Sequence, residues 1–278
     1  MKRIILTAEG AAKLLKAQKL GHTKTLASLD LGKTTELVLV GKDEFVFRGE
    51  TVSAKELERL KENTCYVLEG GFKSIDFFGE DTNLYYKLKP TKDWPTLTLS
   101  SVPMHRFKRV SPKEDSKTKL DEITLIKGTV LDTCCGLGYT AIGATASAEE
   151  VITFEKDSNV LRIAEYNPYS EELFANKKIK LRQESVADGI KKLKSNYFDR
   201  IIHDPPTVSF APELYEEAFY EELFRVAKKG AILYHYCPNP GKTKGGLFWP
   251  TIQKRLEKTG FKNCKYGEKS SGIRCLKN

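Results

Sequence analysis

The residues Asp204-Pro205-Pro206 directly follow the run Arg200-Ile201-Ile202-His203. Two consecutive prolines end a strand and fix φ twice, so the acid and the neighbouring carbonyl groups point in set directions. An exocyclic amine on a heteroaromatic ring is a poor nucleophile, because its lone pair is delocalised into the ring. Acceptors that hold both amine hydrogens make the nitrogen more tetrahedral and align it with an electrophilic carbon. We therefore predict that the Asp204 carboxylate and the Pro205 carbonyl hold such an amine.

A glycine-containing turn earlier in the chain is a second candidate site. The run Val130-Leu131-Asp132 is followed by two cysteines and then by Gly136-Leu137-Gly138, before a helical pattern begins. Glycine permits a sharp turn and a close approach of the backbone to a ligand. A second strand-like run ends in Glu155, whose carboxylate can accept two hydrogen bonds from ribose hydroxyls. The spacing predicts a nucleoside site; the alternatives are a turn tightened for packing and a surface acid at a strand end.

The elements that must position these residues alternate between strand and helix. We expect strands at 129–132, 151–155, 179–182, 200–203 and 231–236, and helices at 139–148, 158–166, 185–193 and 212–227. A further helix at 246–259 and two last strands at 261–266 and 273–276 complete about seven strands. This alternation predicts an α/β fold with a parallel sheet covered on both faces. Ligands of such folds bind at the carboxyl ends of the strands.

The first 110 residues have a different pattern. Short β-rich runs recur there between Gly, Asp and Asn, and helical patterns begin near Thr7 and Ser53. We predict a smaller α+β domain over residues 1–110 that positions the substrate. Residues 111–122 are polar and contain Pro112, which predicts a linker. The α/β domain then covers residues 123–278.

The turn and Glu155 together resemble those of class I S-adenosylmethionine-dependent methyltransferases, which have an acid before the glycines and lack the third glycine of dinucleotide binders. The resemblance implies a Rossmann-like methyltransferase domain with S-adenosyl-L-methionine as cofactor. Asp132 would lie near the methionine part, Gly136 and Gly138 would form the pocket floor, and Glu155 would hold the ribose. Further candidate cofactor-binding residues are Cys134, Tyr139, Lys156 and Ser185. Ser185 stands where the family often has an Asp that meets the adenine amine; Asp188 is the alternative.

The segment Asp204-Pro205-Pro206-Thr207 resembles the D-P-P-Y box of amino methyltransferases that act on adenine N6, cytosine N4 or guanine N2. Thr207 replaces the aromatic residue that stacks on the target base, and Phe210 could restore that stacking. The alternative without function is a proline-stiffened loop. Methylation of pyrimidine C5 would need a cysteine nucleophile at this strand end, and the chain has none there. We expect His203 to point into the packing and not to act as a general base.

A longer resemblance covers nearly the whole chain. It connects the sequence with a group of predicted archaeal ribosomal RNA cytosine-N4 methyltransferases, through the segments 28–32, 65–71, 85–88, 95–97, 104–106, 199–207, 213–215, 219–220 and 233–236. The resemblance implies a methyltransferase that adds one or two methyl groups to cytosine N4 of ribosomal RNA. The residue chemistry alone does not distinguish cytosine from adenine or guanine.

The charge distribution is the basis for expecting a polyanionic partner. The net charge is +9, and residues 177–194 and 242–278 are rich in Lys and Arg. We expect RNA as the partner, with ribosomal favoured over transfer RNA, and substrate contacts from Thr207, Phe210, His105, Arg106 and Arg109. The alternatives are scattered solvated lysines and a solvated basic linker. The rival functions are an aminopropyltransferase or small-molecule N-methyltransferase, and an RNA-binding ribosome factor without catalysis.

Composition excludes several classes of protein. With 40% hydrophobic and 30% charged residues, the chain is not disordered, collagen-like or a coiled coil. No apolar stretch approaches the ~18–20 residues of a membrane-spanning helix, and no signal-peptide pattern opens the sequence. The six cysteines form no C-x-x-C, so we expect neither a metal site nor a disulfide framework, and reduced thiols in the cytoplasm. The oligomeric state is not indicated.

Overall fold

The computed structural model describes residues 3–124, 126–237 and 248–278. The chain divides into two compact units. Unit 1 comprises Met1–Lys113 with Arg162–Glu171, and unit 2 comprises Glu114–Leu161 with Glu172–Asn278. Unit 2 contains the strands that end at or directly before Asp132, Glu155 and Asp204.

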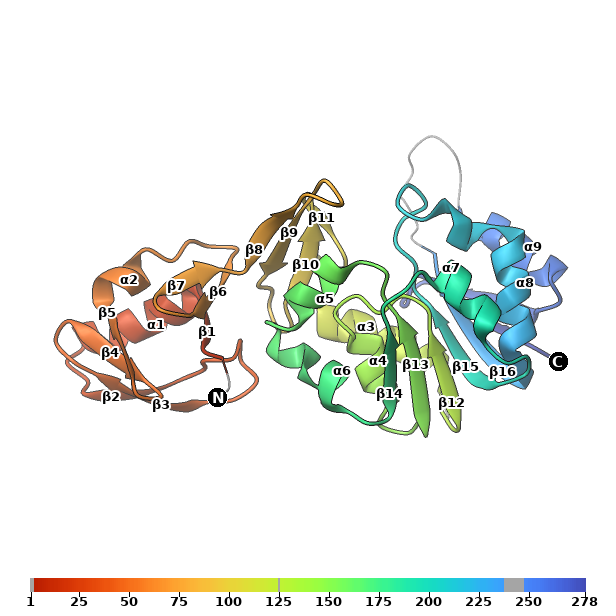
Figure 1. The fold of residues 1–278 in the computed structure, drawn as a ribbon. Coiled ribbons are helices and arrows are strands. Elements are labelled where there is room, and N and C mark those ends of the chain that lie inside the picture. The colour runs from red at the N-terminus through yellow and green to blue at the C-terminus, as the bar shows by residue number, and fades with distance from the viewer. Residues whose placement is uncertain (1–2, 125, 238–247) are drawn as a thin grey trace. The chain divides into compact units, whose positions relative to one another are not determined.

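Unit 2 is built on a seven-stranded sheet (Figure 1). Its spatial order is β14 (Ile179–Arg182), β13 (Glu150–Phe154), β12 (Thr129–Asp132), β15 (Phe198–His203), β16 (Ala227–Tyr236), β18 (Gly272–Leu276) and β17 (Lys262–Gly267). The first five strands are mutually parallel, and β18 is antiparallel to both of its neighbours. The order reverses between β12 and β15, which is where such folds bind ligands. The predicted Rossmann-like α/β fold is confirmed.

Alternate residues of the central strands enter two separate hydrophobic clusters. Leu131 and Ile201 belong to one cluster, whereas Val130 and Ile202 belong to the other. Successive side chains of a strand point to opposite faces, so the sheet is covered on both sides and these strands are apolar throughout. The first cluster includes residues of α7 (Val186–Gly189), α8 (Glu217–Val226) and α9 (Trp249–Lys258); the second includes residues of α4 (Tyr139–Ala144), α5 (Ser158–Ala164) and α6 (Glu171–Ala175).

Several predicted helices are shorter or broken. The helix predicted at 139–148 ends at Ala144, and the one at 158–166 ends at Ala164. The helix predicted at 185–193 is α7 followed by the 3-10 turn η2 (Ile190–Lys192), and the one at 212–227 is η3 (Pro212–Tyr215) followed by α8. The second break occurs because Glu216 is extended, with φ −84° and ψ 155°. The predicted helix at 246–259 begins at Trp249, and its first two residues lie outside the described part.

The prediction of a linker at 111–122 is wrong, because Pro112–Glu122 forms helix α3. Proline is tolerated in the first turn of a helix, because its missing N–H would have no intrahelical partner there. Apart from Pro112, the buried positions of α3 are polar: Asp115, Ser116, Thr118 and Lys119. A helix that buries charged side chains in place of apolar ones has no hydrophobic periodicity, so the sequence pattern did not predict this helix.

Unit 1 contains three antiparallel sheets and two helices among its described residues 3–103. The sheets are β1 (Ile5–Thr7), β6 (Cys65–Leu68) and β7 (Phe72–Ser74); β2 (Lys24–Ala27), β3 (Glu36–Val40), β4 (Glu44–Phe47) and β5 (Glu50–Ser53); and β8 (Asp76–Gly79), β9 (Leu84–Lys89), β10 (Thr96–Leu99) and β11 (Val102–Pro103). The helices are α1 (Ala8–Lys19) and α2 (Ala54–Glu58); the 3-10 turn η1 (Pro168–Ser170) also belongs to this unit. The predicted caps Thr7 and Ser53 are confirmed, the latter as a full capping box.

The expectation that all cysteines are reduced is wrong at one pair. Cys264 of β17 and Cys275 of β18 form a disulfide across the two antiparallel strands, with 4.2 Å between their Cα atoms. Strand pairing creates this proximity, which the spacing of the cysteines in the sequence does not reveal. Among the described residues, no helix is long and apolar enough to cross a membrane, and no cluster of His, Cys, Asp and Glu side chains has the makings of a metal site.

Candidate functional site

Three carboxylates of unit 2 follow or end adjacent parallel strands. Asp132 is the last residue of β12, Glu155 directly follows β13, and Asp204 directly follows β15. Because β13, β12 and β15 are neighbours that run in the same direction, these carboxyl ends lie at one edge of the sheet. The sheet therefore brings together the nucleoside candidate and the amine candidate of the sequence analysis.

Asp132 is fully buried beneath this edge. Its carboxylate accepts hydrogen bonds from the hydroxyl of Thr153 at 2.9 Å and from that of Thr140 at 3.3 Å. Burial raises the pKa of Asp132 to about 7, and the negative charge of Asp204 adds to the rise. Near neutral pH the carboxyl group is thus poised between its two protonation states.

Glu155 holds the glycine turn. One carboxylate oxygen accepts a hydrogen bond from the backbone N–H of Gly136 at 2.9 Å, and the other accepts from that of Asp157 at 3.0 Å. Burial raises the pKa of Glu155 to about 7. The adjacent Lys156 side chain is exposed and partly offsets this rise electrostatically. Through these two hydrogen bonds Glu155 stabilises the conformation of the glycine turn.

The turn itself requires glycine at two positions. Gly136 has φ 55° and Gly138 has φ 80°, a region that side chains other than glycine seldom adopt. A Cβ atom at Gly138 would lie 2.9–3.2 Å from three atoms of the Leu173 side chain. Of the other predicted cofactor-binding residues nearby, Cys134 is partly buried, whereas the Tyr139 side chain is buried at the start of α4. A ligand contact through the Tyr139 ring is therefore not supported.

The candidate adenine contacts follow β14. Ser185 is half-buried at the N-cap of α7, and its hydroxyl makes no capping hydrogen bond there. Asp188 is exposed and pairs with Lys191 at 3.5 Å. Ser185 thus keeps the position at the strand end that the sequence analysis assigned to it, and Asp188 is engaged on the helix surface.

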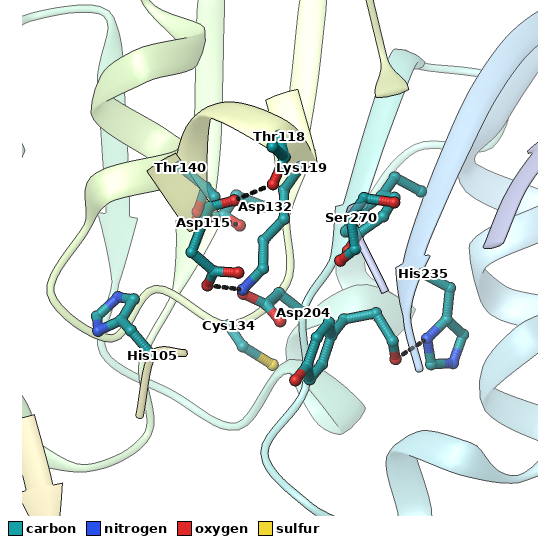
Figure 2. Close-up of polar contacts among 12 residues, drawn as sticks. His105, Asp115, Thr118, Lys119, Asp132, Cys134, Thr140, Asp204, His235 and Ser270 are labelled. Carbon is teal, nitrogen blue, oxygen red and sulfur yellow. Dashed lines mark hydrogen bonds and ion pairs between the residues drawn. The ribbon is translucent and has the colours of Figure 1, made fainter. Parts of the chain in front are cut away.

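The carboxylate of Asp204 is paired with a lysine that the sequence analysis missed. The Lys119 ammonium group lies 2.6 Å from Asp204 Oδ2 and 2.9 Å from Asp115 Oδ2. Figure 2 shows the Lys119 side chain extending from α3 to a point between the two acids, with Asp132 and Cys134 beside them. The signal that could have indicated this arrangement is the spacing of Asp115 and Lys119, four residues apart on a helix.

The segment after Asp204 is exposed apart from its first proline. Pro205 is buried, the Pro206 carbonyl accepts a hydrogen bond from the Tyr215 hydroxyl at 2.8 Å, and Thr207 is exposed. The Phe210 side chain is 38% exposed. A large aromatic ring at the surface, six residues beyond the acid, is available for contact with a flat ligand.

His203 and His235 lie side by side beneath Asp204, with ring centroids 4.4 Å apart. The Leu214 carbonyl accepts from Nε2 of His203 at 3.0 Å, and the Thr133 hydroxyl lies 2.8 Å from its Nδ1. Burial lowers the pKa of His203 to about 3, so its ring is neutral. The expectation that His203 is a packing residue is confirmed.

The three basic candidates for substrate contact belong to unit 1. His105 is buried, and its Nδ1 lies 3.0 Å from the Thr96 hydroxyl; its predicted substrate contact stays a prediction. Arg106 is partly buried and Arg109 is exposed. Substrate roles for these two arginines stay predictions.

The raised pKa of Asp132 predicts a fall in stability with rising pH. The unfolded chain releases this proton near its ordinary pKa of 3.8, whereas the folded protein releases it near 7. Below pH 3.8 the carboxyl group is protonated in both states, so its burial does not oppose folding. Between pH 3.8 and about 7 the free energy of unfolding falls as the pH rises, by roughly 2–4 kcal/mol in total. Asp132→Asn should flatten this fall in urea titrations at a series of pH values, and the exposed Asp188→Asn should not. Equal slopes for all three proteins would contradict the burial argument.

The comparisons with known proteins agree with the fold. No family model matches the chain. A spermidine synthase solved with the transition state analogue AdoDATO has a TM-score of 0.57 and 18% identity, covering 73% of this chain and 71% of that chain. The spermidine synthase of Thermotoga maritima gives a TM-score of 0.57 and 17% identity, covering 73% and 72%. At these identities the likeness concerns the fold alone.

One curated relative matches along almost the entire chain. It is the uncharacterized protein MJ1233 of Methanocaldococcus jannaschii, which is 41% identical over 282 residues, covering 98% of this chain and 95% of the relative. Identity of this extent includes both units and the site at the sheet edge. The chain therefore belongs to the same protein family as MJ1233 of Methanocaldococcus jannaschii.

Proposed function

We propose that this protein transfers the methyl group of S-adenosylmethionine to an exocyclic amino group of an RNA base, with cytosine N4 of ribosomal RNA as the favoured target. The observation that carries the proposal is the position of Asp204, which follows β15 directly and lies beside the glycine turn after β12. The proposed amine acceptor, Asp204, and the proposed nucleoside-binding turn thus lie at the same edge of the sheet.

The residues of the turn fit the cofactor. The left-handed backbone at Gly136 and Gly138 leaves the floor without side chains, and Glu155 stands at the end of β13 where a ribose would lie. The partly titrated Asp132 gains a favourable partner when a positively charged ligand enters beside it. Bound S-adenosylmethionine supplies an electrophilic methyl group; the protein supplies the floor, the ribose acceptor and the counter-charge.

Asp204 and the Pro205 carbonyl would then orient the substrate. Both are acceptors, and an amine held by two acceptors presents its lone pair in a fixed direction. No covalent intermediate with the protein is required. The hydrogen bond from Tyr215 to the Pro206 carbonyl holds the second proline in place, so the acceptors are set before the substrate arrives.

The charge around Asp204 favours a neutral amine over a cationic one. Spermidine synthases share the fold, and an aminopropyltransferase would have to bind a polyamine, which is cationic at neutral pH. In this chain the Lys119 ammonium group already occupies the side of Asp204 at 2.6 Å. Lys119 thus already serves as a counter-ion of Asp204, which weakens the attraction of this carboxylate for a second ammonium group, whereas the uncharged amine of a base needs only an acceptor oxygen. The intact Asp204-Pro205-Pro206 segment also argues against a purely RNA-binding factor.

Phe210→Ala tests whether a base stacks beside the acid. Stacking of a base on an aromatic ring contributes ~1–3 kcal/mol, so kcat/KM for RNA should fall by roughly 5- to 150-fold. The affinity for S-adenosylmethionine should stay unchanged. Val208→Ala is the matched control, because Val208 is a 40% exposed apolar residue of the same segment but has no ring. Equal effects of the two substitutions on steady-state methylation kinetics would assign the stacking to another residue.

The function itself is tested by reconstitution. Ribosomal RNA from a strain that lacks the gene is incubated with the purified protein and methyl-labelled S-adenosylmethionine, and its nucleosides are analysed by mass spectrometry. Label on N4 of cytidine supports the full proposal, and label on another base amine supports the reaction but replaces the target. Absence of label from RNA, together with aminopropyl transfer to a polyamine from decarboxylated cofactor, would overturn it.

A further inference from the structure

The charged side chain of Lys119 is almost completely buried. Its side chain is 3% exposed, that of Asp115 is 0% exposed, and that of Asp204 is 20% exposed. The ammonium group also lies 4.6 Å from the centre of the Tyr236 ring, a distance that suits a cation–π contact. Removing an ammonium group from water is costly unless it is paired on more than one side. α3 (Pro112–Glu122), the residue that follows β15 (Phe198–His203) and β16 (Ala227–Tyr236) supply those partners.

The same helix contains an ion pair of the ordinary kind, which shows what helix stability alone needs. Lys117 pairs with Asp121 at 2.8 Å with the same spacing of four residues, on the exposed face of α3. Such a surface pair supports a helix without burying charge. Replacing buried ion pairs by apolar side chains is often neutral or stabilising, so stability alone does not account for Lys119 and its two acids.

Several groups face Asp204 and determine its ionisation. Lys119 is a cation at 2.6 Å, and the described groups that interact electrostatically with Asp204 include Asp132, Cys134 and Tyr215. Asp115 and Tyr236 face Lys119 from its other sides. Burial lowers the pKa of Lys119, but Asp204 and Asp115 outweigh burial, so its pKa is raised and the group stays charged.

We propose that Lys119 is the positioning residue of the amine site: its ammonium group fixes one oxygen of Asp204, keeps the carboxylate ionised at neutral pH and directs it to accept a hydrogen bond from the substrate amine. This inference rests on the proposed function. An ionised carboxylate only accepts hydrogen bonds, whereas a protonated one also donates, and a donor facing an amine hydrogen is repulsive. Lys119 thus acts through Asp204 and does not touch the reacting atoms.

The test compares Lys119→Met with Lys117→Met over a range of pH. For Lys119→Met we expect kcat at about pH 7 to fall by roughly 10- to 100-fold and to recover at higher pH, where Asp204 ionises unaided. KM for RNA and the calorimetric affinity for S-adenosylmethionine should change much less than kcat. Lys117→Met should behave as the wild-type protein. A loss of kcat by the same factor at every pH, or no loss at all, would overturn the proposal.

A second variant guards against misfolding. Lys119→Met leaves Asp115 buried without its cation, so the double variant Lys119→Met with Asp115→Asn removes that charge as well. We expect it to show the same recovery of kcat with rising pH. Circular dichroism and thermal unfolding identify which variants are folded before kinetics are compared. A folded double variant with a wild-type pH profile counts against the proposal.

A titration that needs no methyl transfer separates this inference from the proposed function. Carbon-13 labelling of the aspartates follows the Asp204 carboxyl signal by NMR, with Asp204→Asn as the assignment control. The pKa of Asp204 should rise in Lys119→Met and stay at the wild-type value in Lys117→Met. If the wild-type protein methylates no RNA but this shift is observed, the function fails and the effect of Lys119 on Asp204 stands. If methylation is found and the Asp204 pKa is the same in both variants, the function stands and the positioning role fails.

Discussion

Replacing Asp204 by alanine is expected to lower kcat for methyl transfer by about 100- to 10,000-fold, the range for removal of a group that orients or accepts a proton from the nucleophile. The affinity for S-adenosylmethionine should stay nearly unchanged, because Asp204 follows β15, whereas the proposed cofactor floor follows β12. Single-turnover methylation of RNA and calorimetry of cofactor binding measure the two quantities separately. Preserved turnover would remove the acceptor role that we assign to this carboxylate.

Asp204→Asn is the more stringent companion of this variant. The amide oxygen can still accept from Lys119, which lies 2.6 Å from Oδ2 in the native protein. The amide NH2 group then faces the substrate amine, so two donors meet and the hydrogen bond is lost. We therefore expect the asparagine variant to remain folded, as judged by thermal unfolding, and to be nearly as inactive as the alanine variant.

Gly138→Ala should have the second large effect, on stability. Alanine at φ 80° costs ~1–2 kcal/mol, and the new Cβ would contact Leu173 at 2.9–3.2 Å, which costs ~1–3 kcal/mol more. The expected fall in the free energy of unfolding is therefore roughly 2–5 kcal/mol, measured by urea denaturation. Gly230→Ala is the matched control, since Gly230 has φ 81° but no atom within 4 Å of an added Cβ. Equal destabilisation by the two substitutions would exclude a contribution from Leu173.

The sheet and the placement of its acids were predictable from the sequence, because the signals are local. Buried parallel strands are short apolar runs, and each run here ends in or just before a polar residue: Asp132, Glu155 or Asp204. Strand direction then places these residues at one edge without knowledge of any side-chain contact. Strand alternation and turn chemistry therefore sufficed for the seven-stranded fold and for the meeting of the three carboxylates.

The features that escaped prediction depend on contacts between distant segments. Helix α3 has a polar sequence because it buries Asp115 and Lys119. The acid that pairs with Lys119 from outside the helix is Asp204, which lies 85 residues later in the chain. Cys264 and Cys275 meet through strand pairing, and His105 is buried against Thr96. Periodicity and composition do not predict such contacts between residues that are distant in the sequence. The RNA partner and the target base likewise stay predictions.

The neutral histidine pair beneath the site changes how pH profiles of this protein should be read. Enzymologists usually assign an inflection near pH 7 to an imidazole. In unit 2 the histidines are His203 and His235, and burial lowers the pKa of both, to about 3 for the former. The groups that titrate near neutrality there are the carboxyls of Asp132 and Glu155. An inflection in that range that arises in unit 2 would accordingly report on these two carboxyl groups beside the glycine turn, and not on His203 or His235.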